Sequence, residues 1–198
     1  MDSTTNHIRT AAAISGVTDL LYEEFQQLWH RPPPDKGQWP AWHVLAIIVM
    51  LVAFGIEHAL KALLRKQGCK PSHIRNLRHD LRKLYKELDS HTQTRIQENA
   101  DVLDPPIKHG GKVTSFSVEA VLNEHRDSFQ EWRYHEYRFP GVMVETLIYT
   151  LVAMLHTYHD LYGTDDFSGK PQMDVNRPPP EMKAIAKKYL RNILRPRA

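Results

Sequence analysis

An uninterrupted run of 13 apolar residues, from Val44 to Ile56, constrains the fold of this 198-residue chain more than any other feature. Such a run must leave water, but a helix that spans a membrane needs about 20 apolar residues. Glu57, His58 and Lys61 follow the run at once, in the same helical frame. We therefore expect a buried core helix over about residues 41–67, stopping at Gly68, and no membrane span.

The composition is typical of a cytoplasmic globular protein. The chain has 41% hydrophobic and 25% charged residues, which favours one domain with a tail. Its single cysteine, Cys69, cannot form an internal disulfide, and its first ten residues lack the pattern of a signal peptide. The formal charge of +3 is too small by itself to indicate a nucleic-acid-binding protein.

Helical periodicity recurs along most of the chain, and we find no strand-like alternation. Apolar residues three or four apart predict helices over residues 8–29, 41–67, 71–88, 92–102, 117–137 and 142–162. Prolines and glycines predict a loop over residues 104–111, and Ser117 is the expected N-cap of the helix that follows. We expect an all-α antiparallel helical bundle over residues 1–162, a linker over 163–180 and a short basic helix over 181–198.

Three segments carry a resemblance to a known family. They are Phe54–Leu64 with its Glu57 and Lys61, His79–Tyr85 with its opening His-Asp-Leu, and Glu131–Tyr137 with its Trp-Arg-Tyr. In this order and spacing they resemble the HEPN superfamily of small helical domains, over roughly residues 40–160. The resemblance implies a HEPN-like bundle, a homodimer and a link to RNA or nucleotides, and many members act in toxin–antitoxin or phage-defence systems.

The ribonuclease motif of that superfamily is not found in this chain. Ribonuclease members carry an arginine, four to six further residues and then a histidine. Here three residues separate Arg75 from His79, eight separate Arg126 from His135, and one separates Arg133 from His135. The resemblance therefore does not imply catalysis, and whether the protein is an enzyme stays open.

Charged residues beside the apolar run need partners if they are buried. Glu57, His58 and Lys61 either form an internal set of ion pairs and hydrogen bonds or line a ligand site. Arg133 and Glu136 lie at the edge of the apolar stripe of the expected 117–137 helix. There the planar guanidinium of Arg133 suits either a carboxylate such as Glu57 or a phosphate.

His79 and Asp80 admit two interpretations. In a helix that continues from Pro71, His79 faces outward or toward a second subunit. In a helix that begins beside the two residues, Asp80 is the N-cap and His79 packs at the turn. The family resemblance favours the second interpretation.

Basic residues gather in two stretches. Residues 181–198 hold six lysines and arginines against one acid, and residues 70–89 hold six against three. Each stretch is either a solvated surface or a patch that binds phosphates without sequence specificity. His156, His159 and Asp160 share one helix face, but we identify no further ligands, so we expect no metal and no cofactor.

These observations favour a binding or regulatory module whose ligand is RNA, a nucleotide or a protein partner. Its candidate binding residues are Glu57, Lys61, Arg133, Glu136, Lys187, Lys188 and Arg191. The first alternative is a rearranged ribonuclease that uses Arg133, His135, His79 or Asp80. The second is a structural subunit of a defence assembly.

Overall fold

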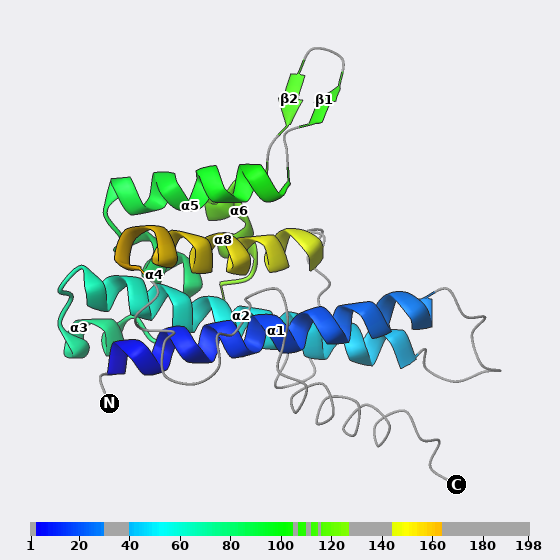
Figure 1. Ribbon diagram of the computed structural model, residues 1–198, viewed down its shortest axis with the longest axis horizontal. Helices are drawn as coiled ribbons and strands as arrows, with labels where there is room; N and C mark the ends of the chain where they lie inside the picture. The colour runs from blue at the N-terminus through cyan, green and yellow to red at the C-terminus, as the bar shows by residue number, and fades with distance from the viewer. Residues whose placement is uncertain are drawn as a thin grey trace, which may run out of the picture.

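The computed structural model describes residues 3–29, 40–104, 107–109, 112–114, 116–126 and 144–163. Four long helices dominate this part of the chain and confirm the all-α prediction: α1 (Ser3–Trp29), α2 (Pro40–Lys66), α5 (Ser90–Leu103) and α8 (Val144–Tyr162). Figure 1 shows α1 and α2 side by side and antiparallel, with α8 and α5 stacked over them. Because α8 is antiparallel to α5 and runs in the same direction as α2, the bundle consists of two antiparallel pairs.

The apolar run of α2 forms the centre of the core. Val44, Ile48, Val52 and Ile56 are fully buried, and α1, α4 and α8 all pack against this helix. By length and composition alone, Val44–Lys66 is apolar enough to cross a membrane, but 67% of its most apolar stretch is buried inside the protein. Burial of this degree is what the predicted core helix requires.

Three helices approach one another closely at Gly55 of α2. A β-carbon at this position would lie 2.9 Å from Leu151 Cδ2 of α8 and 3.0 Å from Ile14 Cγ2 of α1. Carbon atoms in ordinary contact are about 3.5–4.0 Å apart. Nearby, the Tyr22 hydroxyl donates a hydrogen bond to Glu145, which joins α1 to α8 a second time. The packing of these helices therefore depends on the missing side chain of Gly55.

A turn divides the predicted 71–88 helix into α3 (Pro71–Asn76) and α4 (Leu81–Lys86). Arg78 has a φ of +56°, in the left-handed region that interrupts a helix of L-residues. Asp80 Oδ1 then accepts a hydrogen bond from the Lys83 amide at 2.9 Å and caps the new helix. The continuous helix is thus wrong, and the interpretation in which Asp80 is an N-cap is confirmed.

A short hairpin replaces part of the loop predicted over residues 104–111. Strand β1 (Ile107–His109) pairs antiparallel with β2 (Lys112–Thr114), with Lys108 opposite Val113. In the sequence only Gly110 and Gly111 separate the strands, and a Gly-Gly pair at this spacing is a known hairpin signal that the helical periodicity obscured. Figure 1 shows the hairpin projecting from the end of α5, away from the helices.

Helix α6 (Val118–Glu124) is much shorter than the predicted 117–137 helix. Ser117 caps it as expected, since its hydroxyl accepts a hydrogen bond from the Ala120 amide at 3.3 Å. The helix ends because His125 turns away with a ψ of 14°, and the Arg126 carbonyl accepts a hydrogen bond from the Leu81 amide instead. The remainder of the predicted helix, the linker over 163–180 and the basic helix over 181–198 lie outside the described residues.

The approach at Gly55 yields a prediction about stability. We expect Gly55→Val to lower the free energy of unfolding by about 1–3 kcal/mol, the usual range for overpacking a filled core. Urea denaturation followed by circular dichroism measures this change. Thr94→Val on the exposed face of α5 is the control, and it should shift the free energy by less than about 0.5 kcal/mol. Equal losses in the two variants would contradict the close approach.

Candidate functional site

A buried carboxylate lies where α2 meets the turn before α4. Glu57 is only 2% exposed, and its Oε1 lies 2.5 Å from Lys61 Nζ, one helical turn further along α2. From the turn, His79 Nδ1 lies 2.9 Å from Glu57 Oε2. An isolated buried carboxylate is strongly unfavourable, so these two contacts are what permit the charge inside the core. The internal ion pair considered for Glu57 and Lys61 is confirmed.

Sequence reasoning named His79 but not its partner. The two residues are 22 positions apart, and they meet only because the chain turns at Arg78. The ring of His79 therefore bridges the core and the surface, since its side chain is 44% exposed while Glu57 is buried. The only sequence signal for this contact was that Glu57 and His79 belong to two segments of the same family resemblance.

A histidine pair extends the polar cluster toward α1. His7 Nδ1 of α1 lies 2.9 Å from His58 Nδ1. One of these two nitrogens therefore donates a hydrogen bond, and the other accepts it and carries no proton. Burial, reinforced by the neighbouring His7, lowers the pKa of His58 to about 4. Burial and then the charges of Lys61 and Arg65 lower the pKa of His7. Sequence analysis missed His7, because no local pattern indicates that it faces α2.

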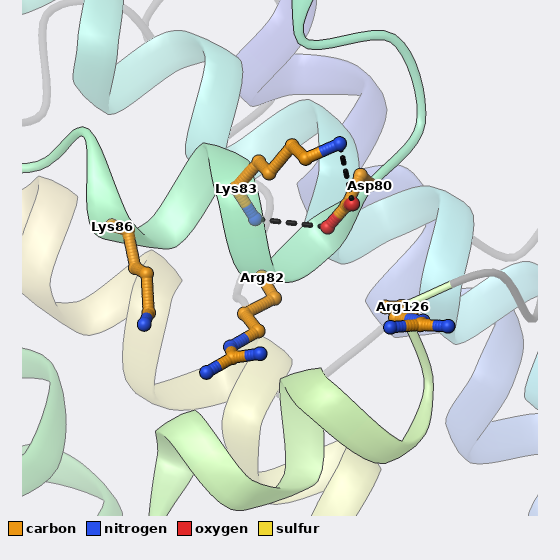
Figure 2. Close-up of a pocket in the computed structure, with 5 residues that line it drawn as sticks. All are labelled: Asp80, Arg82, Lys83, Lys86 and Arg126. Atoms are coloured by element: carbon orange, nitrogen blue, oxygen red, sulfur yellow. Dashed lines mark hydrogen bonds and ion pairs between the residues drawn. The ribbon is translucent and has the colours of Figure 1, made fainter.

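A basic hollow opens on the other side of the same turn. It has a volume of about 490 Å³ and is lined by Asp80, Arg82, Lys83, Lys86 and Arg126. Figure 2 shows the three cations of α4 on one helix, with Arg126 reaching the hollow from the chain that leaves α6. Four cations and one carboxylate thus converge from two separate elements. We call this feature the basic hollow.

The cations of the basic hollow are only partly neutralised. Lys83 Nζ lies 3.3 Å from Asp80 Oδ2, and Lys86 Nζ lies 3.2 Å from Glu119 Oε1 of α6. Arg82 Nε is shielded from solvent and lies 3.8 Å from the same Glu119 oxygen, beyond hydrogen-bond distance. Because Arg82 and Lys86 share Glu119 as their carboxylate partner, the hollow retains a positive charge that suits an anion.

The other predicted site residues lie outside the part of the chain that the structure describes: Arg133, His135, Glu136, Lys187, Lys188 and Arg191. Among the described residues no three His, Cys, Asp or Glu side chains gather as metal ligands. Asp160, which shares a face with His156 and His159, instead pairs with Arg95 Nη2 at 3.1 Å and joins α8 to α5.

Comparison of the chain with protein-family models, curated proteins and solved structures gives no match.

Removing one partner of Glu57 should cost more stability than removing a surface partner. We expect Lys61→Met to lower the free energy of unfolding by about 2–3 kcal/mol, because Glu57 is then left with His79 alone. Lys83→Met breaks a pair whose lysine is 68% exposed, and it should lower the free energy by at most about 1 kcal/mol. Urea titrations at neutral pH compare the two. Similar losses would show that Glu57 does not depend on Lys61.

Acidification should destabilise the fold through its buried histidines. Burial also lowers the pKa of His125 to about 4, so His58 and His125 both resist protonation in the folded protein. Between pH 6.5 and about 4 the unfolded chain binds these protons and the folded chain does not, so the free energy of unfolding falls as pH falls.

Denaturation at pH 7 and pH 5 tests this dependence. His58→Gln should lose less stability over this interval than the unmodified protein does. His91→Gln, at an exposed position of α5, should behave like the unmodified protein. An identical pH dependence in all three proteins would contradict the assignment to His58.

Proposed function

We propose that the protein is a HEPN-like, dimeric, cytoplasmic binding or regulatory module that engages RNA or a nucleotide through the basic hollow. The observation that carries this proposal is that Arg82, Lys83 and Lys86 of α4 line one hollow together with Arg126. Lysine and arginine bind phosphates through charge and through N–H donors, and arginine does so in a bidentate manner. A toxin–antitoxin or phage-defence system is the biological setting that the resemblance suggests.

The character of the lining favours an anion such as phosphate over a protein partner. The five described residues that line the hollow are all charged, and such a lining gives a protein partner no large apolar side chain against which to anchor. Binding then rests on charge and depends on salt, as binding to a phosphate backbone does. A protein partner in a larger defence assembly remains the alternative outcome of the binding experiment.

A second candidate function is a rearranged ribonuclease, favoured by the contact between Glu57 and His79. A histidine that a buried carboxylate orients is the usual arrangement of a general base, and Asp80, the next residue in the chain, lines the basic hollow. Arg133 and His135 were the other residues named for this role. Gel analysis of RNA incubated with the protein and with His79→Asn tests it, since cleavage must be lost in the variant.

Reversing the charge of the basic hollow should abolish most RNA binding. We expect Lys83→Glu combined with Arg126→Glu to weaken the binding of a short labelled RNA at least about tenfold at low salt, since two phosphate contacts become repulsive. Fluorescence anisotropy measures the affinity.

The matched control is Lys70→Glu combined with Arg75→Glu. This variant changes the net charge equally at exposed positions that do not line the hollow. It should bind RNA nearly as well as the unmodified protein, with only the small loss that the lower overall charge produces. Equal losses in the two double variants would show that the net charge of the protein, and not the hollow, accounts for RNA binding. If the unmodified protein binds neither RNA nor nucleotides, the proposal is refuted.

A further inference from the structure

Among the described residues, Asp80 is the only one lining the basic hollow whose side chain accepts hydrogen bonds. Arginine and lysine side chains only donate hydrogen bonds, and an ionised carboxylate only accepts them. We infer that Asp80 binds a ribose hydroxyl next to the bound phosphate, so that the hollow selects ribonucleotides over deoxyribonucleotides. This inference rests on the proposed function and names the chemical class of ligand for the same site.

The local structural role of Asp80 does not require its negative charge. Its Oδ1 accepts the Lys83 amide at 2.9 Å as the N-cap of α4. Asparagine caps helices about as well as aspartate does, without repelling a phosphate. The charge of Asp80 also pairs with Lys83 and suits the N-terminus of α4, but it weakens the binding of a phosphate, so its place in a phosphate site needs a further explanation.

The remaining acceptor capacity of Asp80 supplies that explanation. A carboxylate offers about four lone-pair positions, and the contacts of Asp80 with the described residues use two, one for the Lys83 amide and one for Lys83 Nζ. Lys83 is 68% exposed on a flexible stem, so its ammonium can turn from Asp80 to a ligand while the capping oxygen stays in place. Oδ2 then accepts a hydrogen bond from a donor on the ligand.

The arrangement of charge orients such a ligand. Phosphate oxygens are attracted by Arg82, Lys86 and Arg126 and repelled by Asp80, so the group that faces Asp80 must be a donor. None of the described residues that line the hollow is aromatic, so they offer a base no stacking surface. The donor that lies next to a phosphate in every nucleotide of RNA, and is absent from DNA, is the 2′-hydroxyl.

The test compares RNA and DNA of one sequence by fluorescence anisotropy, with the full chain and two variants. The unmodified protein should bind RNA about tenfold more tightly than DNA, which is the contribution of one hydrogen bond to a charged group. Asp80→Asn retains the cap but places an amide donor toward Lys83, so it should bind DNA more tightly than the unmodified protein and prefer RNA by less than about twofold.

Asp89→Asn is the matched control. Asp89 caps α5 in the same way, with Oδ1 2.8 Å from the Thr92 amide, but it does not line the hollow. This variant should keep the preference of the unmodified protein. Isothermal titration with ATP and with dATP repeats the comparison for a free nucleotide. If the unmodified protein prefers ATP and Asp80→Asn removes this preference, the ligand of the hollow is a free ribonucleotide.

The outcomes separate the two proposals. If the charge-reversal variant loses RNA binding but the unmodified protein binds RNA and DNA equally, or Asp80→Asn keeps the preference, the role of Asp80 is overturned and the proposed function stands. If the unmodified protein binds neither nucleic acid nor nucleotide, both are overturned.

Discussion

The burial of one negative charge, on Glu57, determines the arrangement of the rest of the site. This carboxylate sits at the end of an apolar run in the central helix, where it is stable only with a cation and a hydrogen-bond donor against it. Lys61 supplies the cation from the same helix, and His79 supplies the hydrogen-bond donor from a distant part of the chain. His79 reaches Glu57 because the chain turns at Arg78, and α4 begins directly after this contact.

The basic hollow follows from that turn. Once Asp80 caps α4, the side chains of Arg82, Lys83 and Lys86 take positions on one short helix. The amide of Leu81, the first residue of α4, donates a hydrogen bond to the carbonyl of Arg126. This hydrogen bond ties α4 to the chain that leaves α6. Backbone contacts therefore bring the four cations together, and this arrangement does not require a bound ligand.

Much of this could be predicted from local sequence patterns. The spacing of apolar residues indicated the four long helices, and the charges beside the apolar run indicated the ion pair of Glu57 with Lys61. Contacts between distant segments could not be predicted in this way. The pairing of His79 with Glu57, of His7 with His58 and the place of Arg126 each depend on how separate helices pack, which one sequence does not record. A helix that begins at Asp80 was one of the two interpretations of the sequence, but no pattern indicated the turn at Arg78 itself, because a left-handed arginine is rare.

The order of the helices along the chain also governs how the protein folds. Helices α1 and α2 are consecutive, so they can pair as soon as both are formed, whereas Gly55 and Leu151 are about a hundred residues apart. We therefore expect docking of α8 on α2 to be a late step. Until it occurs, the most apolar helix of the chain keeps one face in water, and a nascent or partly folded molecule would have to be protected from aggregation.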